Sequence, residues 1–282
     1  MHSQHFPKLD ISTIAPTRNA LHAYSQILGA WLKDYNTKRK HWWHASLRPS
    51  LNGLTTGVVR EGIDFEIELN LRESVLQLRT STGAVLSQAL DGQPALVVAD
   101  RINGFLVADG LDEKVIPASN HHGENIVAFR DYSPATAGTL GCVLHSVFAA
   151  LTEFRAGIRE ETSPIQLWPH HFDVSMLWLP GDKVPDQDPD DEEYADKQMN
   201  FGFTFGDEGI PEPYFYVTAY PLPNTFPQTS LPAGATWHSD GFKGVVLLYK
   251  TLSQSSDPTA YLLELWQGLL TAGREQMLTI TH

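Results

Sequence analysis

Short stretches in which apolar and polar residues alternate are the feature that most constrains this fold. In residues 64–71, four apolar side chains alternate with four polar ones. This period of two is typical of a strand with one buried face, and residues 75–80 can form its partner after a turn at residues 72–74. Strands of a parallel sheet are buried on both faces and lack this alternation, so the pattern favours antiparallel pairing.

Four helices are predicted from apolar residues that recur every three or four positions. They span about residues 18–35, 94–109 and 133–159, and a last one begins at Asp257-Pro258. Aspartate is a preferred helix cap and proline a preferred first residue, which supports that start. Pro16-Thr17 is the expected start of the first helix.

Further strands are predicted from apolar runs bounded by turn residues. Two of them bear on function: residues 43–47, which alternate up to Pro49, and residues 165–179, interrupted only by Pro169. The others cover residues 200–205, 214–220 and 244–249, the first two joined by a turn at residues 206–209.

The order helix, strands, helix occurs twice along the chain. We therefore predict an α+β fold of mostly antiparallel sheets covered by helices. The length, 282 residues, is slightly above the usual range for one domain, so one large domain or two closely packed halves are expected. We predict that residues 1–282 form a single compact domain. We further predict two similar halves, residues 15–110 and 133–277, which either share one sheet or pack as two.

The chain carries a formal net charge of −13, and much of it is local. Residues 182–197 contain eight acidic residues and two lysines, a net charge of −6, with two prolines and no apolar periodicity. We interpret this segment as a solvated loop, because the alternative of a calcium loop lacks the ligand spacing and glycine of an EF-hand. Binding to nucleic acid is not expected, since the one basic cluster, residues 38–41, is too small to neutralise a phosphate backbone.

Neither a membrane segment nor a secretion signal is expected. The longest apolar runs fall short of the ~20 residues that span a bilayer, and the first ten residues lack an apolar stretch behind a basic start. The single cysteine, Cys142, cannot form an internal disulfide and is interpreted as a small buried residue rather than a nucleophile. We therefore expect a cytoplasmic protein, with a small molecule or further copies of itself in a homo-oligomer as partners.

The usual cofactor and nucleophile motifs are absent, and the candidate chemistry lies around Pro169. In a continuous strand, His171 and Asp173 would share one face and His170 the other. Such a pair can act as a general base or hold a divalent metal; the alternative is a structural hydrogen bond. A one-residue slip at Pro169 would exchange His170 for His171 in the site.

Two residues of the earlier strand are candidates for the same site. His44 and Arg48 would share a face if residues 43–47 continue as a strand, and arginine suits a carboxylate or phosphate on a ligand. The alternative for Arg48 is an ion pair with Glu66 or Glu68 on a neighbouring strand.

An acidic turn precedes the predicted strand 214–220. Its carboxylates, Asp207, Glu208 and Glu212, lie among two glycines and two prolines, so the turn is either a rigid ligand-holding loop or an ordinary tight hairpin. Beyond it, Tyr214 and Tyr216 share a face that is either the floor of a pocket or a half-exposed sheet surface.

Five short segments of the chain together resemble those of a known family. They are residues 41–44 (HWWH), 53–57 (GLTTG), 163–173 (SPIQLWPHHFD), 201–208 (FGFTFGDE) and 212–217 (EPYFYV). As a set they resemble a family of uncharacterised bacterial proteins, the domain of unknown function 5996. The resemblance implies an antiparallel α+β fold and a bacterial, cytoplasmic setting, but no activity.

Two functions are compatible with these residues. The first is a small-molecule or metal-dependent, hydrolase-like site on the polar face of the sheet, with His171 and Asp173 as metal ligands. The second is a non-catalytic binding or assembly module, in which the same aromatic strands pack a core or a subunit interface.

Overall fold

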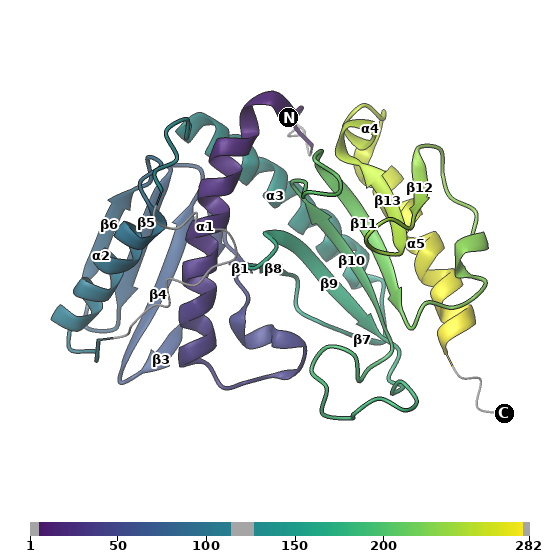
Figure 1. Ribbon diagram of the computed structural model, residues 1–282, viewed down its shortest axis with the longest axis horizontal. Coiled ribbons are helices and arrows are strands. Elements are labelled where there is room, and N and C mark those ends of the chain that lie inside the picture. The colour runs from purple at the N-terminus through teal and green to yellow at the C-terminus, as the bar shows by residue number, and fades with distance from the viewer. Residues whose placement is uncertain (1–5, 114–126, 279–282) are drawn as a thin grey trace.

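The computed structural model describes residues 6–113 and 127–278, in which two antiparallel sheets are flanked by helices (Figure 1). The first sheet consists of β1 (Arg48–Pro49), β2 (Gly53–Thr55), β3 (Val59–Glu61), β4 (Ile63–Asn70), β5 (Val75–Thr80) and β6 (Val85–Ala89). The second consists of β7 (Glu161–Thr162), β8 (Gln166–Trp168), β9 (Asp173–Leu179), β10 (Gln198–Thr204), β11 (Tyr214–Tyr220), β12 (Ala235–His238) and β13 (Gly244–Leu248). The helices are α1 (Ile11–Tyr35), α2 (Ala95–Ala108), α3 (Pro134–Ala156), α4 (Tyr249–Ser253) and α5 (Pro258–Met277), with the short 3-10 segments η1 (Lys40–Ala45) and η3 (Phe226–Gln228). The predicted α+β fold with antiparallel sheets is confirmed.

The second sheet is apolar on one face and polar on the other. Met176, Phe201 and Val217 are cross-strand neighbours in β9, β10 and β11, and all three are buried. On this face Phe154 of α3 lies 4.8 Å from the Phe201 ring and 5.3 Å from Trp266 of α5, centroid to centroid. Helices α3 and α5 therefore cover the apolar face, and the alternation of the strands directs the polar side chains to the other.

Helix α1 begins earlier than predicted. Asp10 caps it by accepting a hydrogen bond from the backbone N–H of Ser12 at 3.1 Å, and Pro16 lies inside the helix. The predicted start at Pro16 is wrong because the aspartate cap outweighs the one hydrogen bond that a proline cannot donate. The last helix starts as predicted, with the side chain of Asp257 accepting from the N–H of Ala260.

The predicted continuous strand 165–179 is instead the hairpin β8–β9. Strand β8 ends at Trp168, whose carbonyl accepts hydrogen bonds from the N–H groups of His171 and Phe172, and Phe172 adopts a left-handed φ of 54°. Pro169 ends the strand because it has no N–H to continue the ladder. His170 and His171 thus lie in the turn, and the assignment of strand faces made for them does not apply.

The predicted strand 43–47 is also wrong. Most of it belongs to the 3-10 segment η1, where His41 and Trp42 have left-handed φ values of 52° and 56°. Only Leu47 pairs in a ladder, exchanging two backbone hydrogen bonds of 3.0 and 2.9 Å with Leu167. His44 and Arg48 therefore do not share the face of one continuous strand.

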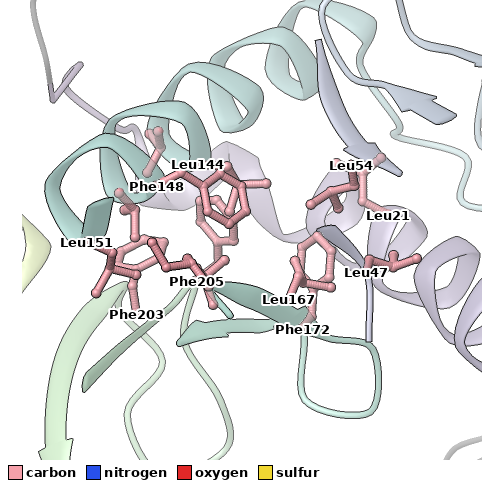
Figure 2. Close-up of a cluster of buried hydrophobic side chains, with 14 of the residues drawn as sticks. Leu21, Leu47, Leu54, Leu144, Phe148, Leu151, Leu167, Phe172, Phe203 and Phe205 are labelled. Carbon is pink, nitrogen blue, oxygen red and sulfur yellow. The ribbon is translucent and has the colours of Figure 1, made fainter. Parts of the chain in front are cut away.

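The Leu47–Leu167 pair connects the two halves of the chain, because Leu47 precedes β1 of the first sheet and Leu167 belongs to β8 of the second. Figure 2 shows the apolar cluster around this bridge. It combines side chains of both halves: Leu21, Leu47 and Leu54 with Leu144, Phe148, Leu151, Leu167, Phe172, Phe203 and Phe205. The chain thus forms two sheets rather than one shared sheet, with a common core; the similarity of the halves stays a prediction.

Helix α3 is long and apolar enough to cross a membrane by length and composition, which the count of uninterrupted apolar residues did not indicate. Half of that stretch is buried inside the protein, and the core helix of a soluble protein passes the same test. Cys142 lies on the outer side of α3 and is exposed, so its interpretation as a buried residue is wrong.

Candidate functional site

A cavity of about 800 Å³ lies against the polar face of the second sheet. Its floor is formed by β9, β10 and β11, and its walls by α1, η1, the β8–β9 turn and the acidic segment 182–197. The lining includes Gln26, Lys33, Asp34, His41, Trp42, Trp168, His170, His171, Asp173, Glu193, Tyr194, Gln198, Asn200, Tyr216, Thr218 and Tyr220. Aromatic rings and a few polar groups in a concave site are typical of small-molecule pockets.

Asp173 is the buried carboxyl group of this cavity. The residue is 8% exposed; its Oδ2 accepts a hydrogen bond from the Tyr216 hydroxyl, and its Oδ1 has no hydrogen-bond partner among the described residues. Burial raises the pKa of Asp173 to about 6, against the opposing effects of the Tyr216 hydrogen bond and of the electrostatic interaction with His171. Asp173 therefore changes its charge near neutral pH, as a proton-transfer group must.

The position of Tyr216 depends on a glycine in the neighbouring strand. Gly202 is its cross-strand partner, and a Cβ atom at Gly202 would overlap Cζ and the hydroxyl of Tyr216. The ring thus lies across β10 towards β9, where its hydroxyl donates a hydrogen bond to Asp173 and interacts with Ser175. Burial raises the pKa of Tyr216 well above its ordinary value, so the hydroxyl remains protonated and donates to the carboxylate.

The network continues to an indole of the cavity wall. Trp168 donates a hydrogen bond from Nε1 to Oγ of Ser175 at 2.9 Å. Trp168 and Asp173 are paired residues of the β8–β9 hairpin. The hairpin and β11 therefore hold Asp173 through three side chains, which fixes the direction in which it faces the cavity.

Helix α1 supports the turn that carries the two histidines. Gly29 packs so closely that an added Cβ would lie 2.7 Å from Pro169. About two turns earlier in α1, the His22 ring stacks on Phe172 at 5.6 Å, and its Nε2 lies 3.2 Å from the carbonyl oxygen of His170. Burial lowers the pKa of His22 to about 4, so its imidazole is neutral at physiological pH.

The rim of the cavity joins the acidic segment to the basic cluster. Lys38 forms an ion pair with Glu192 at 2.6 Å, and Nε2 of His41 lies 3.0 Å from Oδ2 of Asp196. The N–H of His41 also donates to the carbonyl of Glu192 at 2.8 Å. Residues 182–197 are therefore not merely a solvated loop, as the sequence indicated, but pack against η1 and form part of the cavity wall.

Three of the residues selected from the sequence lie together. His171, Asp173 and Tyr216 all line the cavity. Tyr214 is on the same face of β11 but donates its hydroxyl hydrogen to Asp207, outside the lining.

Two selected residues of the first half lie elsewhere. Nδ1 of His44 accepts a hydrogen bond from the N–H of Arg39 at 3.2 Å, and burial lowers the pKa of His44. Arg48 donates to Oε1 of Gln166 and to the carbonyl oxygen of Trp43, the latter at 3.2 Å. Neither lines the cavity.

The alternative for Arg48, an ion pair with a glutamate of β4, is not found among the described residues. Glu66 accepts a hydrogen bond from Thr55 at 2.6 Å, and Glu68 from Ser50 at 2.7 Å. Both glutamates are therefore bound by hydroxyl groups instead.

The acidic turn before β11 is a tight turn. Oδ1 of Asp207 accepts hydrogen bonds from the N–H groups of Gly209 and Ile210, each at 2.8 Å. Glu208 is exposed, and neither it nor Glu212 lines the cavity.

A metal site needs more donors than the structure brings together. Within residues 6–113 and 127–278, no group of three or more His, Cys, Asp or Glu side chains is arranged to hold a metal ion. His171 and Asp173 would be two ligands without a third, which does not match the three or four protein ligands of zinc sites.

Several residues of the site were not predicted from the sequence. Gly202 carried a signal, because a glycine inside an apolar strand marks a close approach of another group. Ser175, Asn200 and His22 carried none, since a single polar residue in a strand or on a helix has many structural uses.

Comparison with known proteins adds a family but no activity. The model of a family of unknown function, DUF5996, matches residues 6–277. No curated protein matches the chain, and neither does any solved structure.

Proposed function

Because the chain belongs to the family of unknown function DUF5996, we propose its function from the cavity: the protein binds a small organic molecule there and exchanges a proton with it through Asp173. The observation that carries this proposal is a buried carboxyl group with one unbonded oxygen in the lining of an 800 Å³ cavity. A buried acceptor without a partner costs about 1–3 kcal/mol, which a bound molecule would recover by donating a hydrogen bond.

The surroundings of Asp173 support proton transfer. Its pKa of about 6 lies close to neutral pH, where a carboxyl group can both take up and release a proton. Tyr216 holds Oδ2, and Oδ1 is buried without a partner, so a bound molecule that reaches Oδ1 would supply its missing hydrogen bond. The hydrogen bonds from Trp168 to Ser175 and from Tyr216 to Asp173 keep this geometry without the ligand.

The test is a fragment screen by ligand-observed NMR on the wild type and on Asp173→Asn. The asparagine can still accept the Tyr216 hydrogen bond but cannot exchange a proton. We expect the fragments that interact directly with Asp173 to lose roughly tenfold or more in affinity in the variant. Glu208→Gln, which removes an exposed carboxylate outside the cavity, is the matched control and should bind as the wild type does.

The proposal fails if no fragment binds the wild type, or if all bound fragments bind Asp173→Asn equally well. Unchanged circular dichroism, with an unfolding midpoint no lower than that of the wild type, would show that a loss of binding is not a loss of folding.

A further inference from the structure

We propose that the molecule bound in this cavity is an organic cation, such as an amine or another nitrogen cation, whose positive charge lies against Asp173. This inference rests on the proposed function and specifies the class of ligand.

The first reason is that Asp173 has no lysine or arginine partner among the described residues. No lysine or arginine within residues 6–113 and 127–278 forms an ion pair with it, and its bonded neighbour, the Tyr216 hydroxyl, is uncharged. Of the titratable groups near Asp173, His171 stabilises its charge, whereas Tyr214 and Tyr216 lie nearby as neutral phenols. A buried carboxylate is stable only with a counter-charge or several donors. A cationic ligand supplies both.

The second reason is the charge of the cavity wall. Among its described lining residues, Lys33 is the single lysine or arginine, and its Nζ lies 5.2 Å above the Trp42 ring. Three carboxyl groups line the cavity, those of Asp34, Asp173 and Glu193. Without a guanidinium fork the site lacks the bidentate recognition by which proteins most often bind carboxylate or phosphate ligands.

The third reason is the aromatic lining. The rings of Trp168, Tyr194, Tyr216 and Tyr220 border the cavity, and those of Tyr194 and Tyr220 contact each other at 4.9 Å. Aromatic faces attract nitrogen cations through their quadrupoles, by about 0.5–2 kcal/mol each. Together with carboxylates they form the usual environment of bound amines.

The acidic segment 182–197 adds a longer-range attraction. It carries a net charge of −6 and contributes Glu193 and Tyr194 to the wall. Like-signed charge around a cleft raises the local concentration of ligands of opposite sign. A neutral polyhydroxylated molecule could use the same aromatic and amide groups, but it would leave Asp173 without a counter-charge.

The test compares ligands that share a ring and differ in the charge of their polar end group. Phenethylamine, 2-phenylethanol and phenylacetate share a ring and carry positive, zero and negative charge; the cyclohexyl series gives a second set. Affinities are measured by ligand-observed NMR titration at pH 7.5 on the wild type, Asp173→Asn and Glu208→Gln. We expect each amine to bind the wild type roughly tenfold or more tightly than its alcohol, and the carboxylates to bind least.

Asp173→Asn should remove this preference for the amines and leave the alcohols unchanged, while Glu208→Gln keeps it. The inference is overturned if amines and alcohols bind equally, if the carboxylates bind best, if none of the amines binds, or if the preference survives in Asp173→Asn. If only neutral fragments bind in a way that depends on Asp173, the proposal of a cationic ligand is overturned and the proposed function stands. No Asp173-dependent binding by any molecule would overturn both.

Discussion

Folding favours the protonated form of the Asp173 carboxyl group over its charged form. Its pKa rises from the ordinary 3.8 to about 6 because the surrounding strands exclude water. The folded protein therefore binds this proton more tightly than the unfolded chain does. Stability from this source is complete below about pH 4 and is lost as the pH rises through about 6. The proposed proton exchange requires Asp173 to ionise near neutral pH, whereas the fold is most stable while Asp173 is protonated.

Asp173→Asn is expected to stabilise the protein at neutral and alkaline pH, because asparagine carries no buried charge. A difference between 3.8 and about 6 in pKa corresponds to ~3 kcal/mol. Relative to the wild type, the variant should gain up to that amount in free energy of unfolding between pH 4 and pH 7.5. Urea unfolding followed by circular dichroism over this range measures it, and a difference between the two proteins that does not vary with pH would contradict the prediction.

At the scale of elements, two close contacts decide the shape of the site. One is between β10 and β11, where Gly202 gives space to the Tyr216 ring. The other is between α1 and the β8–β9 turn, where Gly29 faces Pro169. In both places the absence of a side chain lets a residue of another element approach closely.

Gly202→Ala should displace Tyr216 and cost about 1–3 kcal/mol in free energy of unfolding. If the overlap with the ring is the cause, the same substitution in a Tyr216→Ala background should cost much less. Urea unfolding of the two single variants and the double variant forms the cycle. Additive losses would show that the glycine is needed for a reason other than this contact.

Gly29→Ala should destabilise the protein by a similar ~1–3 kcal/mol, because the new Cβ would lie 2.7 Å from Pro169 and 3.3 Å from the Ala45 carbonyl oxygen. Gly104→Ala in α2 is the matched control: nothing lies within 4 Å of its added Cβ. There the better helix propensity of alanine should add roughly 0.5–1 kcal/mol. Thermal unfolding distinguishes the two, and equal shifts in one direction would refute the role of the contact with Pro169.

The sequence predicts regular elements well and their interruptions poorly. Strand β4 follows from alternation, β5 from the turn after it, β10 and β11 from apolar runs joined by a turn, and the start of α5 from its cap. The left-handed backbone of His41, Trp42 and Phe172 has no such signal, because any of these residues adopts it only when tertiary contacts hold it there. For the site, the pattern selected Asp173 and Tyr216, but the cavity wall from α1 depends on long-range packing.

At the scale of the whole molecule, the acidic segment and the basic cluster join the two halves beside the cavity. Asp196 is the centre of this contact, with His41 at 3.0 Å and Lys183 at 2.8 Å. Burial opposes its ionisation, but the hydrogen bonds from Lys183 and His41 together with the charges of Lys40 and Lys183 outweigh it and lower the pKa of Asp196. The contact therefore stabilises the fold above the ordinary pKa of an aspartate and is lost as the pH falls through the lowered value.

Asp196→Asn should cost about 1–3 kcal/mol in free energy of unfolding at pH 7, since it leaves His41 and Lys183 without their carboxylate. The loss should shrink at pH 3, where the wild-type carboxylate approaches protonation. Asp190→Asn removes an exposed charge of the same segment and should change stability by less than about 0.5 kcal/mol. Equal effects of the two substitutions at pH 7 would show that only net charge matters.

The tryptophans that line the cavity allow ligand binding to be followed by intrinsic fluorescence. Of the seven tryptophans, Trp42 and Trp168 line the cavity, while Trp31, Trp178 and Trp266 are buried in the core. A bound molecule would change the polarity around the first two indoles and leave the core ones as an internal reference. Occupancy is therefore expected to alter the intrinsic fluorescence of the protein without a label, and Trp168→Phe should remove the part of the signal that comes from beside Asp173.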